Sequence, residues 1–224
     1  NNNSRVSNYV LNLLKTENTH KGLFNAFESF LVKLYRNIGH FFPSISIPLM
    51  LKQIREVTGP ILFFVGDKKF AKHAAGRESE GIKLNVNLIG EALIGEKEAA
   101  HRIKEYCELL RQPNVNYISI KISTIYSQIT SLAYEHSVEV LVEKLSIIYD
   151  ELIAIHEDTG IWKFVNLDME EYRDLHMTLD TFKQTLSLEK YKGLRAGIVL
   201  QAYLPDSYTE IVKLQEWAAK RVSK

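Results

Sequence analysis

The sequence predicts an α/β protein in which a parallel sheet follows an N-terminal helical arm. Residues 1–60 carry helical periodicity, whereas residues 61–224 alternate short apolar runs with amphipathic helical stretches. Four of the runs are centred near residues 87, 120, 166 and 200, between 33 and 46 residues apart. Such an interval holds a strand, a crossover helix and the next strand, so parallel strands are expected. We therefore divide the chain into an arm, 1–60, and a domain, 61–224.

The composition is that of a globular protein and excludes several function classes. Among 224 residues, 28 basic side chains nearly cancel 27 acidic ones, so no net field attracts nucleic acid and we expect no such partner. The single cysteine, Cys107, excludes an internal disulfide, fits a reducing compartment and is expected to pack in the core. No apolar run approaches the roughly 18–20 residues of a membrane span. The chain begins without a signal-peptide layout or a Met, which suggests a piece of a longer protein.

The arm is expected to hold two helices. In 22–38 the apolar residues recur every three to four positions on one stripe, which must pack on the domain or on another chain. That stripe consists of Leu23, Phe27, Phe30, Leu31, Leu34 and Ile38. Pro43 is expected to end this helix, and a second helix is expected at 48–57, with its proline in the first turn. A helix lying on a membrane surface is the alternative for 22–38.

The domain is expected to contain four strand–helix units after an apolar run at 61–65 and a weak helix at 68–77. Strands are expected at residues 84–89, 117–122, 163–168 and 197–203. Two of the helices are expected at 96–110 and 138–156, with Ser137 as the N-cap of the second and Gly160 as its end. The apolar stripes of the four helices are Ala99, Ile103, Tyr106, Leu110; Leu141, Val142, Leu145, Ile148, Tyr149, Leu152; Leu175, Leu179, Phe182, Leu186; and Tyr208, Ile211, Val212, Ala218.

The strands read as apolar on both faces, which is typical of parallel sheets covered by helices. Strict alternation of strand and helix is compatible with a doubly wound sheet or with a (β/α) barrel. Since a closed barrel of this kind needs about eight units, four units amount to half of one.

Polar residues stand at the end of each expected strand, where α/β proteins place their ligands. Glu91 follows the first strand, Lys121 lies in the second, Asp168 ends the third and Gln201 lies in the fourth. A lysine within a buried sheet is costly without a partner, so Lys121 is the most informative of these residues. Asp168 has a second interpretation, because Glu171 three residues later completes a capping box for the next helix.

The common catalytic motifs are absent from the sequence. Gly90 and Gly95 have the spacing of a phosphate loop, but Glu96 occupies the place of its lysine. No metal site is expected, because the histidines are scattered, and no hydrolase triad is indicated. The residues alone leave three hypotheses open. They are a Schiff-base aldolase with Lys121 as nucleophile and Asp168 or Glu91 as acid–base partner, a cofactor enzyme, and a non-catalytic scaffold.

Four strand-end segments together resemble the proline dehydrogenase family, which consists of flavin-dependent (β/α)8 enzymes. The matching segments are VNLIGEALIGEKEA (86–99), YISIKIS (117–123), KFVNLDMEEY (163–172) and GIVLQAYLPDS (197–207). They occur in the family's order and at its spacing, and the resemblance covers roughly residues 60–220. The implied fold is the helical arm followed by the first four units of a TIM-type barrel.

The resemblance implies FAD-dependent oxidation of L-proline to pyrroline-5-carboxylate, with electrons passed to a quinone. It gives Lys121 the role of binding the substrate carboxylate and places Asp168 beside flavin and substrate. Gln201 then hydrogen-bonds the flavin ring, and Val199 lies beside the same cofactor. Glu91 is expected to pair with an arginine of the last barrel helix and to close the site. Asn87 departs from the aspartate that many members have at this position.

The resemblance also implies partners and a location. A pyrroline-5-carboxylate dehydrogenase is expected as a fused domain or a separate partner, in the cytoplasm or at the periphery of the inner membrane. The fifth-strand segment and the arginine pair that holds the carboxylate have no match in these residues. We therefore expect this piece to be inactive alone and to self-associate, because half a barrel exposes sheet edges and interior.

Overall fold

The computed structural model describes residues 2–15, 25–59, 61–63, 68–90, 93–169 and 171–222. The chain divides into two compact units, Asn1–Phe70 and Ala71–Lys224. The arm and domain assigned from the sequence stay a prediction, and Leu23 of the expected stripe lies outside the described residues.

The described residues of the first unit form α1 (Asn2–Lys15), α2 (Ala26–Asn37) and α3 (Pro43–Thr58), with a 3-10 turn before α3, and the unit ends within the first turn of α4. Asn25 and Glu28 form a capping box that starts α2. Pro43 begins α3 instead of ending the helix before it, because the first helical position needs no N–H donor. The expectation of a helix starting at Pro48 is therefore wrong, since Pro48 lies inside α3.

Most of the expected apolar stripe of α2 does not pack within this unit. Phe27, Phe30, Leu34 and Ile38 are exposed, whereas Leu31 is half-buried. The contact with α1 is made by Tyr35, four residues after Leu31, whose hydroxyl group lies 2.7 Å from Ser7 Oγ and donates to Ser7 O at 3.2 Å. Ser7 is buried.

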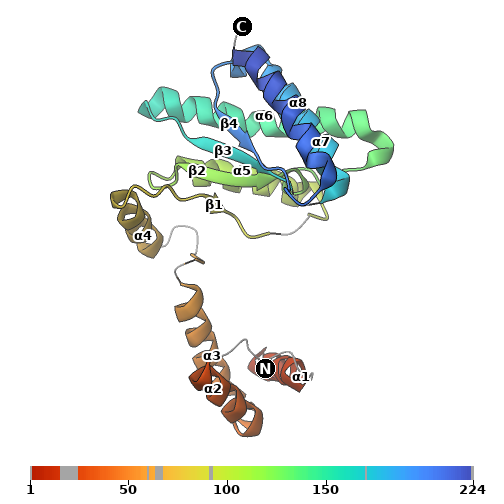
Figure 1. Ribbon diagram of the computed structural model, residues 1–224. Helices are drawn as coiled ribbons and strands as arrows, with labels where there is room; N and C mark the ends of the chain where they lie inside the picture. Colours follow the sequence, from red (N-terminus) through yellow and green to blue (C-terminus); the bar gives the residue numbers. More distant parts are fainter. Residues whose placement is uncertain are drawn as a thin grey trace. The chain divides into compact units, whose positions relative to one another are not determined.

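The second unit contains a parallel sheet of four strands in the order β1-β2-β3-β4 (Figure 1). The strands are β1 (Val86–Asn87), β2 (Tyr117–Lys121), β3 (Phe164–Asp168) and β4 (Ala196–Ile198). The predicted α/β class and the parallel sheet are confirmed, although β1 and β4 are shorter than expected. Each strand therefore lies beside the one that precedes it in the sequence, an order that fits consecutive units of a (β/α) barrel.

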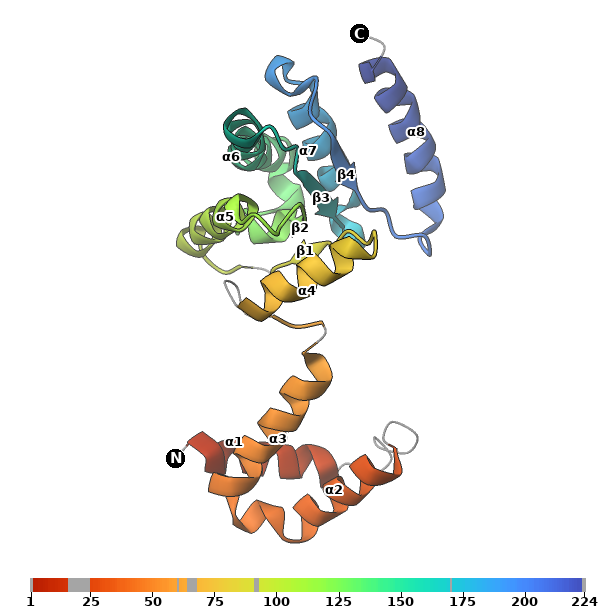
Figure 2. The ribbon, with the colours of Figure 1, turned by 90° about the vertical axis from the view of Figure 1, so that its left-hand side faces the viewer.

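Five helices accompany the sheet, and α5, α6, α7 and α8 follow one another around it (Figure 2). Their bounds are α4 (Lys68–Ser79), α5 (Glu96–Arg111), α6 (Tyr134–Thr159), α7 (Leu175–Ser187) and α8 (Pro205–Val222). The expected stripes of α5 and α7 are confirmed, because all their members are buried. In α6 the same holds except for the half-buried Val142.

The start of α6 differs from the expectation, whereas its end agrees. Ser137 lies inside the helix and is fully buried, so it is not the N-cap. Its hydroxyl group donates to the carbonyl of Thr130 at 3.2 Å and thereby holds the preceding turn. Gly160 ends the helix as predicted, with a φ of 71° that an L side chain rarely adopts.

The expected stripe of α8 is only partly correct, since Ala218 is half-buried but the other three members are not. Tyr208, Ile211 and Val212 are exposed. Leu214 instead packs against a buried cluster made by Met169, Leu175 and Leu179. Near the end of the helix, Arg221 donates hydrogen bonds to the carbonyl oxygens of Leu186, Tyr191 and Leu194 at 3.0, 2.5 and 3.0 Å.

The two faces of the sheet have opposite character. Side chains of register partners in parallel strands point to the same face. One face carries Ile118 beside Val165 and Ala196, and then Ile120 beside Leu167 and Ile198. The other face carries Asn87, Ser119, Asn166 and Gly197 in one row, and Lys121 beside Asp168 in another. The expectation that the strands are apolar on both faces is therefore wrong.

None of the helices formed by the described residues is long and apolar enough to cross a membrane.

Candidate active site at the carboxyl ends of the strands

Lys121 and Asp168 are direct register partners at the carboxyl ends of β2 and β3. Neighbouring strands lie about 4.8 Å apart, so an ammonium group and a carboxylate emerge side by side on the same face. Both side chains are half-buried. The two residues that the sequence ranked highest are thus brought together.

Sequence reasoning missed two residues that fix the position of Asp168. Asn166 contacts it directly, and Gly197 leaves space for Asn166. The Asn166 side chain, which is 5% exposed, donates from Nδ2 to Asp168 Oδ1 at 2.5 Å. Gly197 lies opposite Asn166 on β4. A Cβ atom at this position would approach Asn166 Oδ1 to 2.5 Å and the Phe164 ring to 2.9 Å. The glycine therefore leaves room for the amide that fixes the carboxylate. A signal for Asn166 existed, since it interrupts an apolar run.

The end of β2 is anchored from the helix behind it. Thr124 Oγ1 donates to the backbone carbonyl of Lys121 at 2.8 Å, and the Tyr106 hydroxyl lies 3.0 Å from Thr124 Oγ1. Tyr106 and Thr124 are both buried. Burial raises the pKa of Tyr106, so its hydroxyl group stays protonated and can take part in this chain of hydrogen bonds.

Asp168 does not cap the following helix. It is the last residue of β3, and α7 begins only at Leu175, after a 3-10 turn at Tyr172–Asp174. Glu171 pairs instead with Arg173, with Oε2 at 2.7 Å from Nε. The capping-box interpretation is therefore wrong, and the Asp168 side chain is left for the site.

The remaining predicted residues follow β4 or lie outside the described residues. The Val199 backbone N–H donates to the carbonyl of Leu167 at 2.9 Å, which brings Val199 beside the end of β3. Its side chain is 42% exposed. Gln201 is half-buried in the turn that leads to α8. Glu91 lies outside the described residues, so its place at the rim stays a prediction.

A small cavity lies at the Lys121–Asp168 pair. Its volume is about 10 Å³. It is lined by Lys121, Ile122, Ser123, Asp168, Met169, Glu171, Asp174 and Thr178. Burial raises the pKa of Asp174, and Glu171 adds to this effect, while Arg173 opposes it. The cavity thus joins the strand ends to the beginning of α7.

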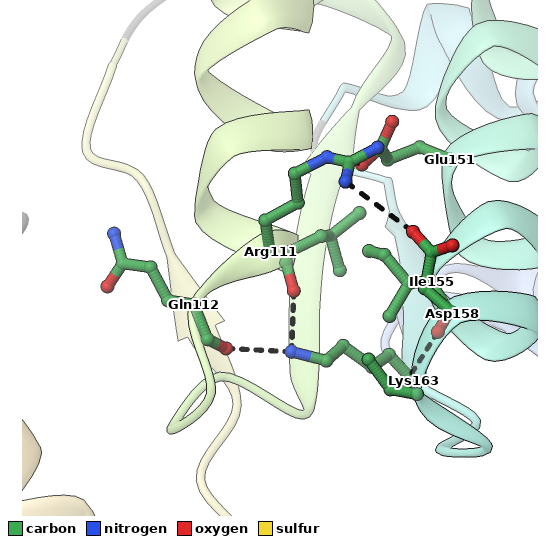
Figure 3. Close-up of polar contacts among 8 residues, drawn as sticks. Arg111, Gln112, Glu151, Ile155, Asp158 and Lys163 are labelled. Carbon is green, nitrogen blue, oxygen red and sulfur yellow. Dashed lines mark hydrogen bonds and ion pairs between the residues drawn. The ribbon is translucent and has the colours of Figure 1, made fainter.

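A larger hollow of about 210 Å³ lies at the opposite, amino-terminal end of the strands. Its lining includes Arg111, Asp158 and Lys163, and Figure 3 shows the polar contacts of these residues. The Lys163 side chain, which is 6% exposed, donates from Nζ to the carbonyl oxygens of Leu110 and Gln112 at 2.5 and 2.7 Å. Arg111 pairs with Glu151 at 2.5 Å and lies 3.9 Å from Asp158. Because both cations already have partners, this hollow is a structural junction.

Comparisons with known proteins agree with this arrangement. The family model "Proline dehydrogenase" matches residues 70–224. No curated protein sequence matches. Among solved structures, proline utilization A (PutA) from Corynebacterium freiburgense matches with a TM-score of 0.70 and 32% identity over 90% of this chain and 20% of its own.

Further PutA structures show the same fold. The protein from Bdellovibrio bacteriovorus, described as inactivated by N-propargylglycine, matches with a TM-score of 0.68 and 27% identity, over 81% of this chain and 21% of its own. A Bradyrhizobium japonicum PutA mutant matches with a TM-score of 0.62 and 17% identity, over 85% and 20% of the two chains, which supports the fold alone. The chain therefore spans about a fifth of the proteins it resembles.

The family model covers most of the chain, including all four strands and the Lys121–Asp168 pair. The resemblance carried by the four strand-end segments is thereby confirmed, and the chain belongs to the proline dehydrogenase family.

Proposed function

We propose that this chain is part of an FAD-dependent proline dehydrogenase that oxidises L-proline to pyrroline-5-carboxylate and passes the electrons to a quinone. The carrying observation is the in-register pair of Lys121 and Asp168 at the carboxyl ends of parallel strands. Because the chain belongs to the proline dehydrogenase family, we infer that the two residues take part in the oxidation of proline. The enzyme would work in the cytoplasm or at the inner membrane that holds the quinone.

Lys121 is suited to bind the carboxylate of proline. An ammonium group at the end of a flexible stem donates up to three hydrogen bonds to an anionic group. Asp168 is its register partner on the neighbouring strand, so a carboxylate and an ammonium group flank the place where the substrate would bind. The hydrogen bond from Asn166 keeps the Asp168 carboxylate in place. Together these residues orient the substrate, which hydride removal requires more than it requires a strong base.

The residues after β4 fit a flavin beside this pair. Val199 presents an exposed aliphatic side chain, and Gln201 supplies an amide with both donors and an acceptor. An isoalloxazine ring needs such an apolar surface together with a few hydrogen-bonding groups. When bound, FAD supplies the acceptor for the hydride that leaves the carbon next to the proline nitrogen. Gln201, Val199 and Asp168 would hold it.

The other parts of the proposal concern architecture. Residues 1–60 would form a helical arm, and 61–224 the first four units of a (β/α)8 barrel. In the described part of the chain the sheet is open, and its polar face carries the candidate site. We expect the missing contacts to the carboxylate and the flavin to come from further barrel units, with Glu91 pairing across to them. A pyrroline-5-carboxylate dehydrogenase, fused or separate, would consume the product.

The function is tested by proline-dependent reduction of a dye or quinone in the presence of FAD. The parent protein that carries this chain is expected to turn over, whereas these 224 residues alone are expected to be inactive and to self-associate. If proline does not increase the rate at which the parent protein reduces the dye or quinone, the proposed function is wrong. Robust turnover by the 224 residues, or monomers in light scattering, would overturn the half-barrel proposal instead.

A matched pair of variants tests the assignment of the binding lysine. Lys121→Met in the parent is expected to raise KM for proline about 10–100-fold, the range for loss of one hydrogen-bonded charge. Lys104→Met removes the same charge from α5, where the side chain is 73% exposed, and is expected to leave KM unchanged. Equal effects of the two variants would exclude a direct role for Lys121.

A further inference from the structure

Two buried polar side chains of the loop and helix after β3 line the same cavity as Lys121 and Asp168. Asp174 is 7% exposed and Thr178 is fully buried. Asp174 is the residue immediately before α7, and Thr178 lies in the first turns of that helix.

The Thr178 hydroxyl group is the feature that points to a bound molecule. Its oxygen has no hydrogen-bond partner within the protein. An unsatisfied buried hydroxyl group is costly, and native proteins rarely leave one without a partner. Asp174 precedes α7 but its side chain makes no capping hydrogen bond to the helix. Its nearest charged partner is Arg173, with Nε at 3.4 Å on a largely exposed side chain.

The size and charge of the cavity select the kind of molecule. About 10 Å³ is at the lower limit for the centre of one water molecule. The carboxylates of Asp168, Glu171 and Asp174 disfavour an anion. Among the described residues no group of His, Cys, Asp and Glu side chains is arranged to hold a metal ion. A neutral molecule that both donates and accepts hydrogen bonds satisfies all of these groups.

We propose that Thr178 and Asp174 hold one ordered water molecule, which connects the start of α7 to the Lys121–Asp168 pair. Asp174 and Thr178 are positioning residues in this arrangement, because they act on the substrate through the water and the pair. The water site stands on the geometry of this chain alone. Its effect on proline binding rests on the proposed function.

The water is detected in the wild-type chain by nuclear magnetic resonance. A cross-relaxation peak between bound water and the Thr178 methyl group is expected, because an ordered water stays beside that group. The peak should persist in Thr178→Ser when read at the Met169 methyl group, which lines the same cavity, and should be lost there in Thr178→Val. Absence of the peak from the wild-type protein would overturn the proposal without any variant.

Thr181→Val provides the matched control. Thr181 lies on the same helix and is fully buried, and its hydroxyl oxygen also lacks a partner within the protein, but it does not line the cavity. This variant is expected to keep the water peak at full intensity. Loss of the peak in Thr181→Val would mean that any change in α7 disturbs the region, and would refute a specific role for Thr178.

The positioning role is read in the kinetics of the parent dehydrogenase. Thr178→Val and Asp174→Asn are expected to raise KM for proline about 3–10-fold with little change in kcat, and Thr178→Ser should restore KM. An unchanged KM in both variants would refute positioning. If the wild-type parent does not oxidise proline, the proposed function fails, while the water peak still decides whether the site exists.

Discussion

Replacement of Lys163 by Met should destabilise the second unit without changing any residue of the candidate active site. Lys163 precedes β3, and its ammonium group donates to the carbonyl oxygens of Leu110 and Gln112 at the end of α5. Those carbonyls belong to the last turn of a helix, which has no intrahelical donors for them. Met has a similar length and is apolar, so the variant removes the hydrogen bonds without opening a large cavity.

The expected loss is about 3 kcal/mol. Hydrogen bonds to a charged group contribute about 1.5–3 kcal/mol each. The wild-type protein also bears a cost for burying the ammonium group, which is visible in the lowered pKa of Lys163. The stabilisation by two hydrogen bonds, less the cost of burying the ammonium group, is roughly equal to the contribution of one such hydrogen bond. With a urea m-value of about 2 kcal/mol/M, the unfolding midpoint should fall by about 1.5 M.

Tryptophan fluorescence in urea is the appropriate assay. Trp162 and Trp217 are the two tryptophans of the chain, and both lie in the second unit. Trp162 stacks on His156 with ring centroids 3.8 Å apart, so its emission reports on the region next to Lys163. Lys104→Met on the exposed face of α5 is the control and should shift the midpoint by less than about 0.3 M. A midpoint in Lys163→Met within that range would refute the reasoning.

The pH dependence has a defined sign. Because burial lowers the folded-state pKa of Lys163, the unfolded chain binds more protons between that pKa and the ordinary lysine value of 10.5. The contribution of this group to stability therefore rises with pH in that window. Lys163→Met should lack this rise, and the difference between the two proteins should grow as the pH approaches 10.5.

Three further predictions concern the site and its surroundings. Gly197→Ala should cost about 1–3 kcal/mol, because the new methyl group meets Asn166 and Phe164, and Gly193→Ala, which has open space, is its control in the same urea titration. Since burial raises the folded-state pKa of Asp174 above 3.8, its stabilising contribution is present below pH 3.8 and is lost as the pH rises through the folded-state value. Asp174→Asn should therefore gain stability relative to the wild-type protein between pH 3.8 and 7, and parallel stability curves would contradict this. Burial raises the pKa of Cys107 to about 11, so a disulfide reagent at pH 8 should label it on the order of 100-fold more slowly in the folded chain than in urea, and equal rates would contradict its packing.

The position of Lys121 and Asp168 at the strand ends could be predicted from two regularities of the sequence. Alternation along the strands and the spacing of the crossover helices place Lys121 and Asp168 at one rim without knowledge of the register. The helix stripes of α5 and α7 were predictable for the same reason, since a buried face of a helix repeats every 3.6 residues.

The wrong predictions of helix N-caps arose where one local sequence pattern is compatible with two different backbone structures. Asp168 and Glu171 have the spacing of a capping box, but the chain makes a 3-10 turn before α7 and uses the aspartate elsewhere. Ser137 has the chemistry of an N-cap, yet its hydroxyl group satisfies a carbonyl of the preceding turn from within α6. The roles of Asn166 and Gly197 depend on strand register, which a single sequence does not encode in any one residue.

The hydrogen bonds that Lys163 and Arg221 donate to backbone carbonyl groups bear on which residues of the second unit can be substituted. Both side chains hold helix ends and connecting loops at the amino-terminal rim, and Lys121 and Asp168 lie at the other rim. The anchoring contacts and the candidate active site thus lie at opposite ends of the same strands. Side chains at the carboxyl rim can therefore be substituted without loss of the hydrogen bonds that anchor the helix ends and loops.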